Sequence, residues 1–506
     1  MKKPISSIVV LGAGSAGLLA ALTLRKKLPA AVSVRVLRSP RIGIIGVGEG
    51  TTPNFPAFLF DYLQLDEERF FREVRPVWKR GIHFIWGPRG EFPYAFGNHY
   101  SVSDTGFRRP NGFYSWGDPY AAGFIGRMMQ QRKVFLPDDN GQPRFDGAYG
   151  YHLENVRLVS WLEAEARQVG VSITDAEVTG TARDGDRIRH LVVDGQEVVK
   201  ADFYVDASGF RSELLHGALE EPFQSFADTL ICDRAVVGGW EREGGDPIQP
   251  FTTSETMPAG WSWRIDHREH VNRGYVYSSA FTTDDEAESL FRKRNPRVET
   301  TRLVNFRSGH YRRSWVGNVC SVGNSAGFVE PMEATALMVL CMELRALAAS
   351  LQEGRLELRS SLIDLYNRFS ENVWSEIHGF LMVHYKFNTL LDTPFWQHCR
   401  DLPLPEDAAR IVGFFQENGP SSFARDWLLP RASQFGTEGW WALLVGQKVP
   451  WKIQPPSPQE QKRWAERQIR LEHAVKHALT TEQILATMDS PAHWQRAREA
   501  RTRQPA

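Results

Sequence analysis

The sequence predicts an α/β fold that begins with a buried strand, a glycine-containing turn and a helix. Residues 8–11 form a short apolar run of the kind that a buried parallel strand shows. Gly12, Gly14 and Gly17 follow with G-x-G-x-x-G spacing, and apolar residues resume with helical spacing from Leu18. The first glycine permits the turn, the second lets the backbone approach a pyrophosphate, and the third permits close helix packing. An ordinary glycine turn is the plain alternative.

The next predicted strand covers residues 32–37, where apolar and polar residues alternate. An acidic residue that binds the ribose hydroxyls usually follows this strand in dinucleotide enzymes, but this chain has Arg38. Arg38 is either an ordinary surface residue or a side chain that lies along an adenine or meets a phosphate. The missing carboxylate argues against NAD as the ligand.

Residues 43–50 contain four glycines, which packing alone does not require. They indicate a backbone held against a flat or anionic ligand. The part of this strap that we expect at the ligand is Gly46, Val47, Gly48, Glu49 and Gly50.

The rest of the chain alternates between strands, helices and long loops. Residues 86–150 are rich in Gly, Pro, Tyr and Phe, which indicates irregular, substrate-side connections. Residues 230–282 are strand-rich and aromatic and predict an antiparallel sheet, whereas residues 360–480 predict helices. The other expected elements are a helix over 57–62, a strand over 78–84, a helix over 152–169, strands over 171–173, 188–193 and 203–206, and a helix over 333–351.

Composition limits the class of protein. A chain of 506 residues is too large for one small core, so two or more packed modules are expected. Lys plus Arg and Asp plus Glu both number 60, so no global charge favours nucleic acid or an anionic membrane. The four cysteines are widely spaced, as is usual for reduced thiols. No run of 18 apolar residues occurs, and we expect a cytoplasmic enzyme without a membrane span.

Several motifs together resemble the flavin-dependent tryptophan halogenase family, between Gly12 and about Trp396. The resemblance implies an FAD-binding Rossmann-like module of the flavin monooxygenase type, with an antiparallel sheet and a largely helical C-terminal module. It places the FAD-binding module at residues 1–355, with a substrate-side sheet inserted at about 86–150 and 215–300, and a substrate-covering helical module at 356–506. The motifs are Gly12-x-Gly14-x-x-Gly17, Gly46-Val47-Gly48-Glu49, Trp78-Lys79-x-x-Ile82-x-Phe84, Asp206-x-Ser208-Gly209, Gly260-Trp261-x-Trp263-x-Ile265, Phe328-Val329-Glu330-Pro331-Met332-Glu333-x-Thr335, His384-Tyr385 and Asp392-Thr393-Pro394-Phe395-Trp396.

The resemblance implies halogenation of an electron-rich aromatic substrate of the indole type. Reduced FAD from a separate flavin reductase, with O₂ and chloride or bromide, would produce hypohalous acid that passes to Lys79. Glu333 would polarise the halogen donor or take the ring proton. An ammonium can hydrogen-bond hypohalous acid, an amine can form a haloamine, and a carboxylate favours a cationic ring intermediate. The plain alternatives are a surface lysine at a strand edge and an acid that interacts with a helix dipole.

The remaining site residues are carried over by position. Cofactor-binding residues are Gly12, Gly14, Ser15, Ala16, Gly17, Arg38, Gly46, Val47, Gly48, Glu49, Gly50, Asp206 and Gly323. Halide would bind backbone N–H groups at Thr335 and Ala336, and no metal is expected. Substrate-side candidates are Phe96, Trp261, Trp263, Trp440 and Trp441, with core packing as the alternative for the tryptophans.

Three features depart from the family pattern. Asp266 stands where the W-x-W-x-I-P motif has proline, and Ala334 and Ala336 stand where E-S-T-G has serine and glycine. If that glycine has a positive φ or leaves room for halide, Ala336 strains or crowds the halide site. Residues 430–436 do not match the segment that holds the polar groups of free tryptophan. Another indole, a phenol or a residue within a peptide fits as well.

Two other functions stay open. One is a halogenase-like monooxygenase that hydroxylates its substrate without halide, motivated by Asp266, Ala334 and Ala336. The other is a non-catalytic flavin-binding protein, against which the retained Lys79 and Glu333 argue. A homodimer is one open alternative for the oligomeric state.

Overall fold

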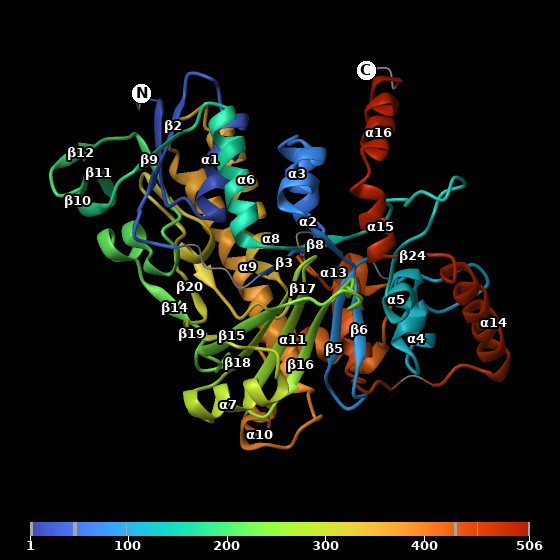
Figure 1. The fold of residues 1–506 in the computed structure, drawn as a ribbon. Coiled ribbons are helices and arrows are strands. Elements are labelled where there is room, and N and C mark those ends of the chain that lie inside the picture. Colours follow the sequence, from blue (N-terminus) through green and yellow to red (C-terminus); the bar gives the residue numbers. More distant parts are fainter. Residues whose placement is uncertain (1–3, 44–47, 98, 430–432, 453, 504–506) are drawn as a thin grey trace. The chain divides into compact units, whose positions relative to one another are not determined.

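The structure is a computed structural model that describes residues 4–43, 48–97, 99–429, 433–452 and 454–503 (Figure 1). It divides into two compact units, each assembled from three segments. Unit 1 comprises Met1–Glu67, Glu154–Asp233 and Asn305–His378, and unit 2 comprises Glu68–Leu153, Arg234–Val304 and Gly379–Ala506. The domains expected from the sequence are two continuous stretches, 1–355 and 356–506, and those boundaries stay a prediction.

Unit 1 is built on a six-stranded, mainly parallel sheet with β1 (Ser7–Leu11) in its interior. β1 pairs parallel with β2 (Ser33–Arg38) and with β13 (Phe203–Asp206). Residues 8–11 are buried, as expected for a parallel strand covered on both faces. The predicted strand, glycine turn and helix, here α1 (Ser15–Lys27), are therefore confirmed. The other strands of this sheet are β9 (Ser172–Asp175), β22 (Val319–Ser321) and the antiparallel edge strand β21 (Trp315–Val316).

Helix α1 packs against α6 (Asn155–Gln168) and α8 (Thr335–Glu353). By length and composition α8 could cross a membrane, but 61% of its apolar window is buried inside the protein, as in a core helix. α6 begins three residues later than predicted, because residue 152 belongs to a strand. Unit 1 also contains β3 (Glu49–Gly50), α2 (Asn54–Pro56), β10 (Val178–Asp184), β11 (Arg187–Val193), β12 (Glu197–Val199), β14 (Phe223–Ser225), β20 (Gly309–Tyr311) and β23 (Gly327–Phe328). Its short helical turns are π-helical over Ala57–Tyr62 and Glu213–Ala218 and 3-10 helical over Gly209–Arg211 and Gly323–Ser325.

Unit 2 contains a seven-stranded sheet. Its strands β15 (Arg234–Glu241), β18 (His270–Tyr277), β17 (Gly260–Asp266) and β16 (Thr252–Met257) pair antiparallel in succession, which confirms the antiparallel sheet predicted for residues 230–282. β5 (Gly81–Ile85) joins β16 in a parallel pair, and β6 (Phe92–Ala95) continues from β5. β19 (Thr301–Asn305) lies at the other edge. The sequence did not predict that residues 81–95 extend this sheet.

Short strands and helices complete unit 2. β4 (Val77–Lys79) pairs antiparallel with β8 (Gly150–Leu153), and β7 (Lys133–Phe135) pairs with β24 (Leu479–Thr480). The C-terminal region is helical as predicted, and Ser457 and Thr480 each begin a helix with a capping box. The other helices are α3 (Glu67–Val74), α4 (Asn111–Tyr114), α5 (Phe124–Gln130), α7 (Asp284–Arg294), α10 (Pro394–Asp401), α11 (Glu406–Asn418), α12 (Ala424–Trp427), α13 (Gly436–Gly446), α14 (Pro458–Val475), α15 (Thr481–Met488) and α16 (Pro491–Arg503). The long helix α9 (Ser360–Lys386) begins in unit 1 and ends in unit 2, with the boundary after His378.

All four cysteines lie among the described residues, and all four are buried thiols. Cys320 ends up in β22 and Cys341 in α8, while Cys232 and Cys399 lie in other parts of the chain. Burial raises the pKa of the Cys320 and Cys341 thiols, so both are held in the protonated form. The prediction of reduced thiols is confirmed.

Candidate functional site

The glycine turn after β1 leaves the backbone open at one position. Gly12 has φ +110°, and a Cβ on it would lie 2.3 Å from the Ala207 carbonyl oxygen. A Cβ on Gly17 would lie 1.9 Å from the Gly12 carbonyl oxygen, whereas a Cβ on Gly14 would meet nothing within 4 Å. The protein's own packing therefore requires glycine at positions 12 and 17. At Gly14 it leaves room for a ligand to reach the backbone.

The start of α1 suits an anion. Ser15 and Ala16 open the helix, and the preceding residue, Gly14, provides no side-chain cap. The first turn contains no acidic residue. Its backbone N–H groups and the helix dipole thus face the open side of Gly14, an arrangement that fits the pyrophosphate of FAD.

Arg38 ends β2 and is occupied by ion pairs within unit 1. Its Nε lies 2.6 Å from Asp175 Oδ1, and its Nη1 lies 2.9 Å from Glu163 Oε2. The hydrogen bond to Asp175 is the main reason why the pKa of Arg38 is raised. These two carboxylates already explain an arginine at this position, so contact with adenine or phosphate stays a prediction.

Asp206 ends β13 and organises the segment that follows. Its Oδ1 accepts hydrogen bonds from the backbone and hydroxyl of Ser208, at 3.0 and 2.6 Å. Its Oδ2 accepts from the backbone N–H groups of Leu214 and Leu215, at 2.8 and 3.1 Å. Burial raises the pKa of Asp206, and these hydrogen bonds oppose the rise. Both carboxylate oxygens of Asp206 thus stabilise the segment that follows β13. The contact of Asp206 with the cofactor stays a prediction.

Gly323 lies against the first turn of α1. A Cβ on Gly323, which has φ +61°, would lie 3.0 Å from the Cβ of Ala16. The Gly323 N–H donates to Oε2 of Glu343 at 3.1 Å. Glu343 is a buried acid of α8, and burial raises its pKa to about 8 while the Gly323 hydrogen bond opposes the rise. Sequence reasoning missed Glu343, although its place among the buried leucines of α8 was a signal.

The strap is described only from Gly48 onwards, because Gly46 and Val47 lie outside the described residues. Gly48 has φ +74°, a conformation that favours glycine. The Glu49 carboxylate accepts a hydrogen bond from Asn155 Nδ2 at 3.1 Å. Burial raises the pKa of Glu49, and the Asn155 hydrogen bond opposes the rise. The strap is thus tied to the first residue of α6.

Glu333 and Thr335 are buried at the start of α8. Between them Ala334 adopts the left-handed conformation, with φ +55° and ψ +39°, as the residue before the helix. Ala336 is helical and half-buried. The positive φ considered for Ala336 therefore occurs two residues earlier, and Ala336 itself is unstrained. The first turn of α8 contains no acidic residue, which suits the expected halide.

Lys79 ends β4 and is fully buried in unit 2, which contradicts the alternative of a surface lysine. Its Nζ lies 5.5 Å from the centroid of the Phe96 ring, so two predicted site residues are brought together. The neighbouring Trp78 packs with its centroid 5.1 Å from Phe71. Successive residues of a strand point to opposite faces, so Trp78 anchors β4 from the other side.

Trp261 and Trp263 lie on one face of β17, as their spacing predicts, with ring centroids 6.1 Å apart. Both are buried. Trp440 and Trp441 are buried in α13, where Trp440 meets Phe380 edge to face, 4.9 Å between centroids. This environment supports the packing alternative for these two residues. Trp427, by contrast, is 76% exposed.

His152 was not among the residues singled out from the sequence, yet it lies beside Lys79. β8 pairs with β4 so that His152 is opposite Val77 and Gly150 is opposite Lys79. Lys79 and His152 therefore share a face as diagonal neighbours. The His152 ring hydrogen-bonds the Asp266 carbonyl through Nδ1 at 3.1 Å and the Thr252 hydroxyl through Nε2 at 2.9 Å.

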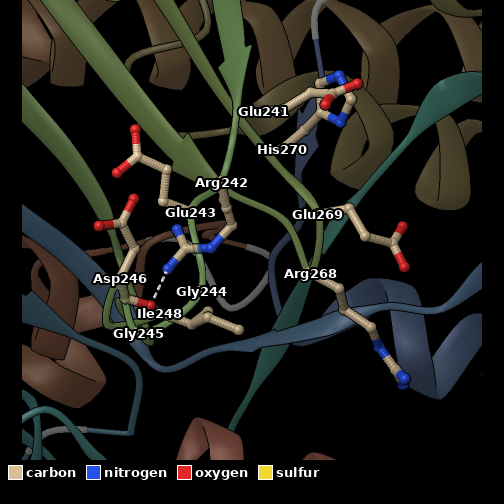
Figure 2. A pocket seen from close by; sticks show the side chains of 10 residues that line it. All are labelled: Glu241, Arg242, Glu243, Gly244, Gly245, Asp246, Ile248, Arg268, Glu269 and His270. Carbon is tan, nitrogen blue, oxygen red and sulfur yellow. Dashed lines mark hydrogen bonds between the residues drawn. The ribbon is translucent and has the colours of Figure 1, made fainter.

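A cavity of about 520 Å³ opens elsewhere in unit 2, at the ends of β15 and β18 (Figure 2). Its lining is mostly charged and consists of Glu241, Arg242, Glu243, Gly244, Gly245, Asp246, Ile248, Arg268, Glu269 and His270. Figure 2 shows the Arg242 guanidinium turned toward the Asp246 carbonyl, to which it donates a hydrogen bond. None of the predicted site residues lines this cavity.

The predicted site residues are shared between the two units. The glycine turn, Arg38, Glu49, Asp206, Gly323, Glu333, Thr335 and Ala336 belong to unit 1. Lys79, Phe96 and the four tryptophans Trp261, Trp263, Trp440 and Trp441 belong to unit 2. Unit 1 thus carries the residues predicted to bind the nucleotide, and unit 2 carries the buried lysine with its aromatic neighbours.

Known proteins are similar to this chain over most of its length. A family model described as tryptophan halogenase matches residues 7–461. The tryptophan 7-halogenase RebH of Lentzea aerocolonigenes is 30% identical over 83% of this chain and 84% of its own. The structure of MibH, a lanthipeptide tryptophan 5-halogenase, is 35% identical, with a TM-score of 0.88 over 97% of this chain and 95% of its own. Tar14, a tryptophan C-6 flavin-dependent halogenase from taromycin biosynthesis, is 27% identical, with a TM-score of 0.85 over 96% of this chain and 100% of its own.

Proposed function

Because the chain belongs to the tryptophan halogenase family, we propose that it is a flavin-dependent halogenase of an electron-rich aromatic substrate. It uses reduced FAD, O₂ and chloride or bromide. The observation that carries the proposal is Lys79, a lysine fully buried next to an aromatic ring. A buried ammonium is costly, and a fold keeps one where its chemistry is needed.

The residues of unit 1 would hold the cofactor and the halide. The open backbone at Gly14 and the first turn of α1 receive the pyrophosphate. Glu49 and the strap from Gly48 lie on the same unit, and Thr335 and Ala336 offer backbone N–H groups to halide. The chemistry that bound reduced FAD supplies is the oxidation of halide by O₂ to hypohalous acid.

Lys79 and Glu333 would then divide the transfer to the ring. Lys79 Nζ donates a hydrogen bond to hypohalous acid as an ammonium, or takes up the halogen with loss of water as an amine. The aromatic ring forms a bond to the halogen as the bond between the halogen and its donor breaks, and the ring becomes cationic. The leaving group is water when the Lys79 ammonium gives its proton to hypohalous acid, or the Lys79 amine when a protonated haloamine is the donor. The Glu333 carboxylate stabilises that cation and accepts its proton, which restores aromaticity.

A tryptophan within a peptide is the second candidate for the substrate class, beside free tryptophan or another indole. It is favoured by the 35% identity to the lanthipeptide halogenase MibH, against 27% to Tar14 over a similar share of the chain. The proposal also includes a separate flavin reductase that supplies reduced FAD and a cytoplasmic location for the protein.

The test is a panel of substrates and halides. The protein receives reductase-generated FADH₂, O₂ and either chloride, bromide or no halide, with tryptophan, indole, phenol and a tryptophan-containing peptide, and the products are measured by mass spectrometry. We expect halide-dependent halogenation of an indole substrate, which Lys79→Met abolishes while flavin oxidation continues. Hydroxylated products that form equally without halide would instead establish the monooxygenase.

A further inference from the structure

Asp266 replaces the proline of the resembled motif and is completely buried at the end of β17. Its Oδ1 accepts from Arg264 Nε at 2.7 Å, and its Oδ2 lies 3.5 Å from Arg242 Nη1. The Arg242 side chain is only 5% exposed. Burying a carboxylate and two guanidinium groups carries a large desolvation cost. The stability of β17 alone therefore does not explain why aspartate stands here in place of proline.

The first route from Asp266 to Lys79 passes through His152. A carbonyl oxygen only accepts hydrogen bonds, so the 3.1 Å contact between the Asp266 carbonyl and His152 places the proton on Nδ1. Nε2 then accepts from the Thr252 hydroxyl at 2.9 Å. Burial, followed by the charge of Lys79, holds the pKa of His152 well below its ordinary value. Lys79 consequently faces a neutral imidazole in one fixed tautomer.

The second route passes through the main chain. The Asp266 carboxylate accepts the backbone N–H of Gln249 at 2.9 Å. The next residue, Pro250, accepts the backbone N–H of Arg80 at 2.7 Å through its carbonyl oxygen. Arg80 follows Lys79 directly in the chain. Asp266 thus supports Lys79 in two ways: its carbonyl oxygen fixes the neighbouring His152 ring, and its carboxylate holds the main chain to which Arg80 is bonded.

We propose that Asp266 is a positioning residue for Lys79, acting through His152 and through the 249–250 main chain, so that the lysine captures hypohalous acid before it escapes. This inference rests on the proposed halogenation. Replacing the carboxylate leaves Arg242 and Arg264 without their counter-charge and loosens the main-chain support. Oxidant formation, which the cofactor residues of unit 1 support, continues.

The experiment compares Asp266→Asn, Asp266→Asn with Arg242→Gln, His152→Asn and the double variant of Asp266 and His152. Asp284→Asn is the matched control, since Asp284 also pairs with an arginine, Arg234, and accepts from Tyr277. Circular dichroism confirms that each variant is folded. Halogenated product and trapped hypohalous acid are measured in the same reaction.

We expect Asp266→Asn to lower product formation about tenfold, as for a small misplacement of a reacting group. The sum of product and trapped hypohalous acid should change less than twofold. Removing Arg242 as well should restore part of the product, and adding His152→Asn should cost little more than either change alone. A parallel fall of halogenated product and trapped hypohalous acid in Asp266→Asn would overturn the inference. So would losses of product in Asp266→Asn and His152→Asn that add up in the double variant.

Acylation of Lys79 in the flavin-free protein, followed by mass spectrometry, separates this inference from the proposed function. A loosened lysine should be acylated about tenfold faster in Asp266→Asn, and unchanged in Asp284→Asn. If the wild type makes no halogenated product, the proposed function fails while faster acylation still supports the positioning role. An unchanged acylation rate in Asp266→Asn refutes that role.

Discussion

The indole of Trp263 occupies the space that a side chain at position 274 would need. β17 and β18 place Trp263 directly opposite Gly274, and a Cβ on Gly274 would lie 1.9 Å from Cη2 of the ring. Trp263 in turn contacts Trp261. Gly274 therefore leaves room for the Trp263 indole to lie against β18. The position of Trp263 in turn determines where Trp261 packs.

Gly274→Ala should displace this indole. We expect a loss of stability of about 1–3 kcal/mol from overpacking, a changed near-UV circular dichroism spectrum and lower halogenation. Gly413→Ala in α11, whose Cβ would meet nothing within 4 Å, serves as the control. Equal unfolding midpoints in urea for the two variants would contradict the prediction.

Gly14 and Gly17 should respond differently to the same substitution. Gly14→Ala places its methyl group in open space at an ordinary φ of −77°, so the flavin-free protein should melt as the wild type does. The methyl group should nevertheless weaken FAD binding about tenfold or more, because it blocks the approach of the pyrophosphate. Gly17→Ala would clash with the Gly12 carbonyl and should lower the melting temperature itself. Fluorescence titration with FAD and thermal melts check both statements.

Glu343→Gln should stabilise the protein at neutral and alkaline pH. Burial raises the native pKa of Glu343 to about 8, above its ordinary value of 4.5, so between these two pH values native Glu343 keeps its proton while unfolded Glu343 loses it. Its contribution to stability is fully present below pH 4.5 and is lost as the pH rises toward 8. The advantage of the glutamine variant should thus grow by at most about 1.4 kcal/mol for each pH unit in that window. Urea unfolding at pH 5 and pH 8 measures it, and an advantage independent of pH would refute the assignment.

Buried neutral histidines should make the protein sensitive to acid. Burial lowers the native pKa of His267 to about 3, and that of His152 is also lowered. Below about pH 6.5 the unfolded histidines bind protons that the native ones refuse, so stability falls by up to about 1.4 kcal/mol per pH unit for each. His267→Gln should reduce the fall in the urea midpoint between pH 7 and 5.5. The exposed His473→Gln is the control and should leave it unchanged.

Local patterns predicted the parts of the fold whose partners are near in sequence. The apolar run, the glycine spacing and the start of α1 lie within a few residues of each other, and their geometry follows from backbone chemistry. The single strand predicted over residues 78–84 is divided at Arg80 into β4, which ends at Lys79, and β5. The pairing of β5 with β16 was not predictable, because it joins residues 82–85 to residues 252–255 through a register that no local pattern encodes.

Side-chain partners across the chain were equally hidden. Arg38 was considered as a nucleotide contact, but Glu163 and Asp175 supply its charge balance from more than 120 residues away. The contact between His152 and Asp266 spans 114 residues and depends on how β8 and β17 end. Such pairs become visible only when the strands and helices that carry them are assembled, and the pair of His152 and Asp266 lies in the same unit as Lys79.

The burial of the four cysteines has a consequence for an enzyme that generates hypohalous acid. Thiolates react with such oxidants faster than most side chains do, and their susceptibility follows exposure and ionisation. Cys232, Cys320, Cys341 and Cys399 are all buried, and for Cys320 and Cys341 burial also raises the pKa of the thiol. The protein thus keeps its most oxidisable atoms out of reach of its own product, and damage accumulated over many turnovers should appear first on other side chains.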